Sequence, residues 1–456
     1  MEKKYKDPYK LMYHISPIKG LLNDPNGLIR YKNEYYVFHQ WNRFGVDHSY
    51  KEWGLFKSSD LIHWENFQSA LIPDMEFDKD GVYSGSAVED QDKMYLFYTG
   101  NVKQGNKRKS YQCLATTVDG RKFLKYGRVV ETPENFTEHF RDPKVWRGLN
   151  CWWMVVGGQT LENEGAIAIF DSKDLYEWRY RGILFDKNMD QMCECPDLFP
   201  LDNSTHVLLV CPQKRNLIDD ENISSYSAYL IGNFNEENGK FVANSNELQL
   251  LDYGFDFYAP QTFIDHLNRR IMMGWMSNMD DQEEKLFPTR ENNYLHSLTI
   301  PRELFLKGNK VCQRPIEELK QLRRRSYQVN TSLPNIMLDT PQFEINIKYD
   351  ERSRKNFSIQ IQDNAISLSY MSKEGLFCLE RESWSTGQRQ KKFCCINTIE
   401  KISILGESSS LEVFVNDGEY VFTSRYISPQ MTNIIAFEGL EDARVNYYVL
   451  DAMEGI

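Results

Sequence analysis

Five short apolar runs recur along the first two thirds of the chain. Each is rich in bulky aromatic or branched residues and has the length of a buried strand. The runs are residues 35–38, 94–98, 152–156, 207–210 and 271–275. Neighbouring runs start roughly 55 to 65 residues apart, a spacing typical of repeated structural units.

A polar motif precedes each apolar run by about 10 to 15 residues, so the motifs share the phase of the repeat. The residues that carry these motifs are Asp24, Ser84, Asp142, Glu194 and Asp256. A second signal follows three of the runs, an aspartate turn closed by an aromatic residue: Asp60 with Trp64, Asp119 with Phe123, and Asp174 with Trp178.

Five units of mostly strand character predict an all-β fold that begins with a five-bladed β-propeller, in which four-stranded sheets surround a channel. If each polar motif opens the innermost strand of its blade, then Asp24, Ser84, Arg141, Asp142, Glu194 and Asp256 converge on one central funnel. A two-sheet sandwich is the alternative, but it does not explain why the polar motifs share one phase.

The repeat stops near residue 300. Residues 313–323 have a proline near the start, acidic residues early and basic residues late, which predicts a short helix. Residues 343–349 and 357–361 then alternate apolar and polar positions, and Asn416-Asp417-Gly418 predicts a hairpin turn. We expect a propeller over residues 1–305, a linker with a short helix over 306–325, and a β-sandwich over 326–456.

Composition narrows the classes of function. The chain has 456 residues, of which 41% are hydrophobic and 26% charged, and its formal charge is −11. A net acidic chain without a long basic block is a poor candidate for binding nucleic acid. No window approaches the roughly 18 apolar residues of a membrane span. No apolar run follows residues 1–6 as a signal peptide requires, and the nine cysteines show no paired spacing, which favours a reducing cytoplasm.

The chemistry follows from three carboxylates in one funnel. The eight histidines form no HExxH or HxH pair, so no metal and no cofactor is expected. Cleavage of glycosides commonly uses two carboxyl groups, one to attack or activate water and one to protonate the leaving oxygen. Asp24, between two amides, suits a nucleophile. Glu194, flanked by cysteines and a proline, suits an acid with a raised pKa. Asp142, beside Arg141, is expected to be ionised and to stabilise a cationic sugar ring.

Each motif also has a plainer interpretation. The stretch Asn23-Asp24-Pro25-Asn26-Gly27 has the composition of a turn, and so does the stretch around Ser84. Arg141 and Asp142 could form a loop ion pair, and Glu194 could be a solvated acid. Their common phase in the repeat favours the functional interpretation.

The same blocks, in the same order, resemble glycoside hydrolase family 32, which contains invertases, sucrose-6-phosphate hydrolases and fructanases. The blocks are Asn23-Asp24-Pro25-Asn26-Gly27, Tyr83-Ser84-Gly85-Ser86-Ala87, Phe140-Arg141-Asp142-Pro143, Glu194-Cys195-Pro196-Asp197 and Asp256-Phe257-Tyr258-Ala259-Pro260-Gln261. The resemblance implies a five-bladed propeller followed by a β-sandwich, and hydrolysis of β-D-fructofuranosides with retention.

The resemblance also implies roles for individual residues. Asp24 would be the nucleophile, Glu194 the general acid/base and Asp142 the transition-state stabiliser. The residues that would contact the substrate are Asn23, Gln40, Trp53, Tyr83, Ser84, Arg141, Cys195 and Tyr258. Leu21, Arg43 and Leu55 depart from the usual family pattern, which would change the rim of the pocket.

Intracellular cleavage of sucrose or sucrose 6-phosphate is the leading expectation. Arg43, His48 and Lys51 are candidates for a basic rim that would meet a phosphate, although solvated loop charges explain them equally well. Hydrolysis of fructo-oligosaccharides or fructans, transfer of fructosyl groups, and a non-catalytic sugar-binding propeller are the alternatives. The expected partner is a small fructoside, and the sandwich is a candidate contact surface for a homo-oligomer.

Overall fold

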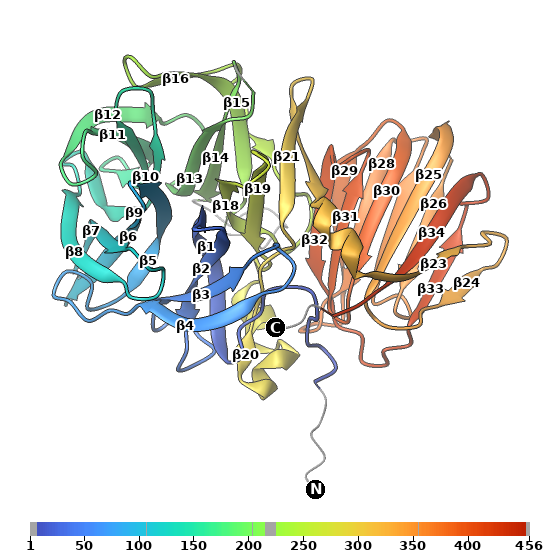
Figure 1. Cartoon of the computed structure of the whole chain (residues 1–456). Helices are drawn as coiled ribbons and strands as arrows, with labels where there is room; N and C mark the ends of the chain where they lie inside the picture. Colours follow the sequence, from blue (N-terminus) through green and yellow to red (C-terminus); the bar gives the residue numbers. More distant parts are fainter. Residues whose placement is uncertain (1–6, 106, 203, 215–224, 354, 453–456) are drawn as a thin grey trace, which may run out of the picture.

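The computed structural model describes residues 7–105, 107–202, 204–214, 225–353 and 355–452. The segment 1–6, on which the expectation about a signal peptide partly depends, lies outside the described residues. Two lobes stand side by side, the first built from residues up to about 315 and the second from the remainder (Figure 1). Within the described residues, no helix combines the length and the apolar character that crossing a bilayer requires.

Five sheets make up the first lobe of the described chain, and their strands pair antiparallel except for β20. The first two sheets contain β20 (Tyr294–Leu295), β1 (Gly20–Tyr31), β2 (Glu34–Asn42), β3 (Glu52–Ser58) and β4 (Glu65–Leu71), and then β5 (Val82–Asp90), β6 (Lys93–Gln104), β7 (Lys107–Thr117) and β8 (Leu124–Glu131). The third contains β9 (Phe136–Arg147), β10 (Trp152–Thr160), β11 (Gly165–Ser172) and β12 (Trp178–Phe185).

The fourth sheet contains β13 (Met192–Pro200), β14 (His206–Gln213), β15 (Ala228–Asn235), β16 (Lys240–Ala243) and β17 (Gln249–Leu250). The fifth contains β18 (Tyr258–Ile264), β19 (Arg270–Trp275), β21 (Arg302–Lys307) and β22 (Lys310–Pro315). The short strand β20 returns from the fifth unit and pairs in parallel with β1, so the last unit is fastened to the first.

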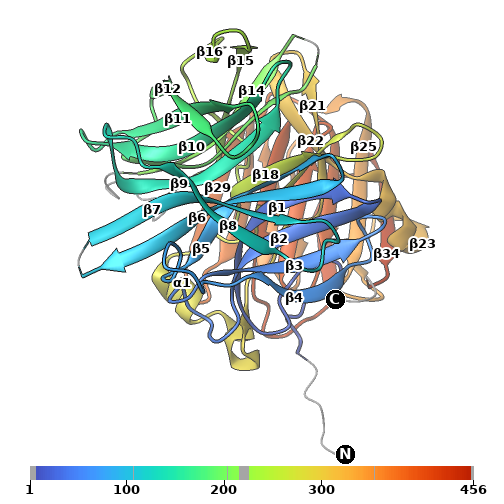
Figure 2. The same cartoon turned by 60° about the vertical axis from the view of Figure 1, so that its left-hand side comes forward.

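The first strands of the five sheets pack against one another in a closed ring. β1 contacts β5, β5 contacts β9, β9 contacts β13, β13 contacts β18, and β18 returns to β1. Each sheet radiates outward from this ring (Figures 1 and 2). The five apolar runs are the second strands β2, β6, β10, β14 and β19, as the period predicts. The architecture is therefore a propeller of five blades, and the predicted all-β fold is confirmed.

The innermost strand of every blade loses its register at the polar motif. The shifts fall between Leu22 and Pro25, Tyr83 and Gly85, Arg141 and Lys144, Glu194 and Asp197, and Tyr258 and Gln261. Proline has no N–H to give to the ladder, and a bulge accommodates it while it redirects the neighbouring side chains. Asp142, Cys195 and Ala259, each directly before a proline, adopt φ values of 69°, 46° and 48°. The polar motifs therefore interrupt the regular hydrogen-bond register of the five innermost strands.

The three aspartate turns are built alike. In each turn one carboxylate oxygen accepts two backbone N–H groups, as Asp174 does from Tyr176 and Glu177, both at 2.9 Å. Asp60 and Asp119 do the same. The repeated signal in the sequence is an Asx turn between the third and fourth strands of blades one to three.

The end of the propeller differs from the expectation. Strands β21 and β22 complete the fifth blade, so the expected boundary at residue 305 falls inside β21, and the propeller runs to Pro315. The expected helix over 313–323 is reduced to a 3₁₀ helix, η2 (Glu317–Leu322), since Gln313, Arg314 and Pro315 belong to β22. The acidic start and basic end of this helix match the prediction, but its length does not.

The second lobe is a sandwich of two antiparallel six-stranded sheets in the described chain. One sheet contains β23 (Arg323–Gln328), β34 (Ala443–Leu450), β25 (Phe343–Ser353), β30 (Ile399–Gly406), β31 (Ser410–Val415) and β32 (Tyr420–Arg425). The other contains β24 (Asn335–Met337), β33 (Ile434–Glu438), β26 (Phe357–Ile361), β27 (Ile366–Met371), β28 (Leu376–Glu382) and β29 (Arg389–Cys395). The alternating apolar positions fill the core between the sheets, and the predicted hairpin turn joins β31 to β32.

A buried polar network joins the two lobes. Arg302 of the fifth blade donates to Glu412 of β31 at 2.5 and 2.9 Å, and both side chains are fully buried. Asp256 lies just before β18 and pairs with Arg381 of β28 at 2.5 Å. The expectation that Asp256 faces the funnel is therefore wrong, because its carboxylate anchors the sandwich to the propeller. All nine cysteines are free thiols.

Candidate active site

The carboxylate of Asp24 is held by hydrogen bonds from two sides. Asn23 Nδ2 donates to Oδ1 at 3.0 Å, and Ser84 Oγ of the second blade donates to Oδ2 at 2.5 Å. Asp24 itself is half-buried, so part of the carboxylate stays accessible. Two donors orient the carboxylate, and a nucleophilic carboxylate needs such a fixed orientation. The predicted contact between Asp24 and its amide neighbour is present.

Glu194 collects donors from three blades. Arg141 donates through Nε and Nη2 to Oε1 at 2.9 and 2.6 Å. Gln213 Nε2 and the Tyr258 hydroxyl donate to Oε2 at 2.8 and 2.5 Å. Burial alone would raise the pKa of Glu194, but Arg141, Tyr258 and Gln213 outweigh it and lower this pKa. The expected raised pKa is therefore wrong for the unliganded site.

Asp142 is enclosed more tightly than the sequence suggests. Its Oδ2 accepts the backbone N–H of Cys195 at 3.0 Å, and its own N–H donates to Thr99 Oγ1 at 3.0 Å. Arg141 turns to Glu194 instead of Asp142. Burial, together with the charges of Glu194 and Asp24, raises the pKa of Asp142 to about 7. The expectation of an ionised Asp142 is corrected, and the charges of Glu194 and Asp24 contribute to the shift.

Three buried residues contact the backbone or side chains of the site: Gln40, Trp53 and Cys195. Gln40 Nε2 donates to Val82 O at 2.8 Å and Trp53 Nε1 donates to Tyr83 O at 2.9 Å, and these two bonds fix the strand that carries Ser84. Gln40 and Trp53 are 2% and 0% exposed, and Cys195 is 1% exposed with its thiol against Asp142. Direct contact with the sugar was expected for all three. Their hydrogen bonds support the residues around Asp24 and Asp142, and direct contact of the three side chains with the sugar stays a prediction.

The three departures from the family pattern have separate positions. Leu21 is fully buried beside Phe287 and Leu295, and Leu55 is buried inside the first blade. Only Arg43 is partly exposed, and its guanidinium donates to Ser69 Oγ at 2.8 Å and lies 3.5 Å from Glu52. Leu21 and Leu55 therefore change the packing beneath the site and do not form its rim.

Two further residues contribute to the site although no sequence pattern predicted them, Gln213 through Glu194 and Thr99 through Asp142. Gln213, which is half-buried, ends β14, and Thr99, which is fully buried, lies within β6; both are polar residues on strands that contain the apolar runs. The position of a polar residue on such a strand is the only signal that the sequence holds for them.

His48, Glu284 and His296 place three ligand atoms within 4.8 Å of one another, the spacing of a metal site. Both imidazoles already face one oxygen of Glu284, at 3.3 and 3.0 Å, so hydrogen bonds account for the cluster.

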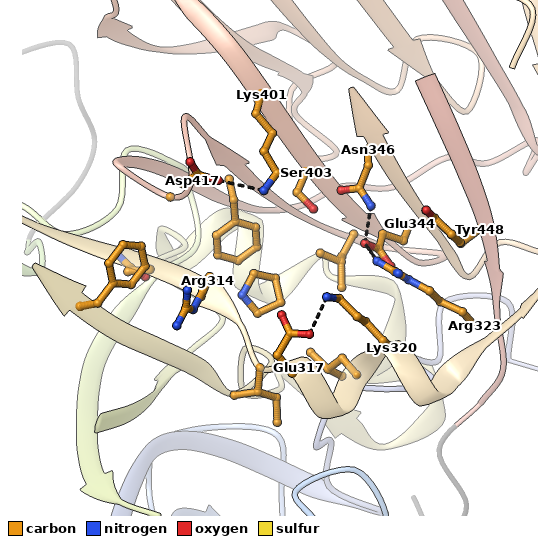
Figure 3. Close-up of a pocket in the computed structure, with 18 of the residues that line it drawn as sticks. Arg314, Glu317, Lys320, Arg323, Glu344, Asn346, Lys401, Ser403, Asp417 and Tyr448 are labelled. Carbon is orange, nitrogen blue, oxygen red and sulfur yellow. Dashed lines mark hydrogen bonds and ion pairs between the residues drawn. The ribbon is translucent and has the colours of Figure 1, made fainter. Parts of the chain in front are cut away.

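A hollow lies between the fifth blade and the sandwich, away from these residues (Figure 3). Its volume is about 560 Å³, and none of the predicted site residues lines it. Its charges are paired, with Lys320 on Glu317, Arg323 on Glu344 and Lys401 on Asp417. These three ion pairs all lie within η2 and the sandwich, so they satisfy the charges of the hollow without linking the two lobes.

A five-bladed propeller that carries Asp24, Asp142 and Glu194 on its inner strands has the architecture and the carboxyl groups that a glycoside hydrolase needs. The N-terminal domain of glycosyl hydrolases family 32 matches residues 14–315, and the C-terminal domain of that family matches residues 318–447. The chain belongs to glycosyl hydrolases family 32.

Named relatives are similar in sequence to this chain over nearly its whole length. The sucrose-6-phosphate hydrolase of Bacillus subtilis (strain 168) is 39% identical over 432 residues, which are 92% of this chain and 89% of that protein. The sucrose-6-phosphate hydrolase of Salmonella typhimurium is 36% identical and spans 97% of this chain and 94% of its own length.

Solved structures give the same picture. The sucrose-6-phosphate hydrolase from Lactobacillus gasseri superimposes with a TM-score of 0.88 at 29% identity, covering 98% of this chain and 94% of that one. A Bombyx mori beta-fructofuranosidase of the same family superimposes with a TM-score of 0.85 at 29% identity, covering 98% and 95%. A mutant of that enzyme has been solved in complex with sucrose.

Proposed function

We propose that the chain hydrolyses β-D-fructofuranosides with retention and that its substrate is sucrose 6-phosphate or sucrose. The observation that carries this is the presence, on one ring of inner strands, of a half-buried carboxylate oriented by two donors at Asp24 and a carboxylate that accepts four hydrogen bonds at Glu194. The curated relatives at 39% and 36% identity are sucrose-6-phosphate hydrolases, which supports the phosphorylated substrate. A cytoplasmic location goes with this proposal, since a phosphorylated sugar is an intracellular substrate.

In the mechanism we propose, Asp24 attacks the anomeric carbon of the fructosyl unit while Glu194 gives a proton to the leaving glycosidic oxygen. A bond forms between an Asp24 oxygen and carbon, and the bond to the leaving oxygen breaks. Glu194, now a carboxylate, then takes a proton from water, whose oxygen displaces Asp24 and restores the original stereochemistry. A retaining enzyme needs its two carboxyl groups roughly 5 Å apart, because no water separates them in the first step.

The mechanism requires a proton on Glu194 when the substrate is bound. In the unliganded site the pKa of Glu194 is lowered while that of Asp142 is raised to about 7, so the shared proton favours Asp142. Substrate hydroxyls that engage Arg141 would weaken its hold on Glu194 and let the proton move there. Asp142, once ionised, would then stabilise the positive charge that develops on the sugar ring.

The experiment compares release of reducing sugar from sucrose, sucrose 6-phosphate and inulin under identical conditions. Turnover of either small sugar with little release from inulin supports the proposal, and preferential release from inulin would make the chain a fructan hydrolase. Binding without turnover would leave a sugar-binding propeller. The ratio of free fructose to fructosylated products at high sucrose separates a hydrolase from a transfructosylase.

The proposal also covers the partners of the chain, which are a small-molecule ligand and a second copy of the chain. The ligand is a small fructoside, and the net charge of −11 argues against nucleic acid. The sandwich remains the candidate surface for a homo-oligomer. Measuring the molar mass in solution by light scattering tests that last point directly.

A further inference from the structure

A buried lysine stands directly behind the nucleophile. Lys51, just before β3, is 9% exposed, and its Nζ lies 2.5 Å from Asn23 Oδ1. Asn23 in turn donates to Asp24. An ammonium group can only donate, so Lys51 forces the amide oxygen of Asn23 toward itself and leaves the amide NH₂ facing the carboxylate. Without Lys51, the same amide could turn its oxygen toward Asp24 and repel it.

Lys51 is itself held from behind. Its Nζ lies 2.8 Å from His48 Nδ1, and since the ammonium donates, that nitrogen must be unprotonated. The ring proton of His48 then sits on Nε2, which faces Glu284 Oε2 at 3.3 Å. His296 Nε2 approaches the same oxygen at 3.0 Å. Burial lowers the pKa of His296 to about 4, so it too is neutral and donates. Lys51, His48 and His296 therefore each donate to an acceptor in this chain of contacts.

The charge of Lys51 survives its burial. Burial lowers the pKa of Lys51 to about 8, while the nearby charges of Asp24, Glu284 and Asp47 oppose that shift. The side chain therefore remains an ammonium at neutral pH. Two of its three protons are already bound by Asn23 and His48, so it is engaged before any substrate arrives.

The chain of contacts reaches the sandwich. Glu284 lies on α1 (Asp281–Lys285), a short helix after the second strand of the fifth blade. Its neighbour Glu283 is buried against the sandwich, where Ser383 Oγ donates to its carboxylate at 2.5 Å and Trp384 Nε1 donates to its backbone oxygen at 2.8 Å. The sandwich thus fixes α1, and α1 fixes the histidine that holds Lys51.

We propose that Lys51 is a positioning residue that orients the nucleophile Asp24 through Asn23, and that the sandwich maintains it through α1 and His48. This inference rests on the proposed fructoside hydrolysis. It gives the second domain a role in catalysis, because removing the support of α1 would loosen the nucleophile. It also assigns Lys51 to the nucleophile instead of to a phosphate on the substrate.

The test measures kcat and KM for Lys51→Met with sucrose and with sucrose 6-phosphate. Methionine keeps the volume and removes the donor. We expect kcat to fall about 10- to 100-fold on both substrates with KM little changed, since a misplaced nucleophile costs about that much. Lys57→Met is the matched control: Lys57 is 3% exposed in the same blade, but its Nζ contacts Tyr36 and not the site. It should leave kcat unchanged.

A second pair of variants guards against a folding defect. His48→Gln keeps an acceptor for Lys51 and a donor for Glu284 and should retain most of kcat, whereas His48→Leu should behave like Lys51→Met. A kcat for Lys51→Met equal to that of the wild type would overturn the inference, and so would equal rates for the two His48 variants. A loss confined to KM for sucrose 6-phosphate would instead make Lys51 a phosphate ligand. Failure of the proposed function is distinct, because the wild type itself would then turn over no fructoside.

Discussion

The hydroxyl group of Tyr258 lies 2.5 Å from Oε2 of Glu194 and donates a hydrogen bond to it, so the fifth blade helps to set the charge of an acid on the fourth. Arg141 of the third blade acts on the other oxygen of the same carboxylate. Residues of the third, fourth and fifth blades therefore together influence the pKa of Glu194. The closed ring of inner strands is what allows residues so far apart in the sequence to act on one group.

Replacing Tyr258 by phenylalanine should move the alkaline limb of the pH profile. The variant removes one donor from the Glu194 carboxylate, so its lowered pKa should rise and the acid form should persist to higher pH. One hydrogen bond to a charged group corresponds to a shift of about one pH unit in kcat/KM. Tyr229→Phe is the control, since the Tyr229 hydroxyl donates to Gln249 at 2.8 Å. A limb that stays in place or moves to lower pH would contradict the assignment.

Replacing Asp24 by asparagine should abolish turnover while leaving the fold intact. The amide keeps the size of the side chain but cannot attack carbon, and losses for a missing nucleophile reach about 10⁴-fold or more in kcat. Thermal unfolding should stay near that of the wild type, because Asp24 is half-buried and its partners Asn23 and Ser84 remain. Substantial residual hydrolysis by a well-folded Asp24→Asn protein would remove Asp24 from the nucleophile role.

Replacing Gln40 by leucine tests the support beneath Ser84. The change leaves the buried carbonyl of Val82 without its donor, which costs about 1–3 kcal/mol of unfolding free energy. It also frees the strand that carries Ser84, so kcat should fall more than KM changes. Urea unfolding and steady-state kinetics give the two readouts. If Gln40 instead contacts the sugar directly, the main effect would be a raised KM without a loss of stability.

Much of the fold is readable from the sequence because two signals are strong. Buried second strands leave uninterrupted apolar runs, and the period of the polar motifs follows the blades. The runs at 94–98 and 152–156 fall inside β6 and β10, and the motif residues Ser84 and Asp142 lie on the inner strands β5 and β9. Because the motifs repeat at the spacing of the blades, they can be placed on equivalent strands, which a single motif does not allow.

The direction of each side chain is not readable in the same way. A shift of one residue sends a strand's side chains to the other face, and here a bulge interrupts each inner strand at the motif itself. Arg141 reaches Glu194 and not its neighbour Asp142 for this reason. Asp256 shares the phase but lies two residues before β18 begins, ahead of the bulge between Tyr258 and Gln261, and so faces the sandwich.

Lowering the pH should strengthen the junction between the lobes through His14. Its two ring nitrogens lie 2.5 Å from Glu407 and 2.8 Å from Glu412, and all three groups are buried. Burial lowers the pKa of His14, but its bonds to Glu407 and Glu412 outweigh this and raise it. A raised folded pKa means that the stabilisation is complete below the unfolded value of about 6.5 and is lost as pH rises through the folded value.

His14→Gln should therefore remove this pH dependence. Urea unfolding of the wild type should show a free energy of unfolding that declines above about pH 6.5, and the curve for His14→Gln should be flatter over the same range. At neutral pH the variant should be less stable by about 3 kcal/mol, since it leaves two buried carboxylates with a weaker partner. His63→Gln is the control, because His63 is half-exposed and pairs only with Asp60 in the described chain. Parallel curves for the wild type and His14→Gln would show that His14 carries no linked proton.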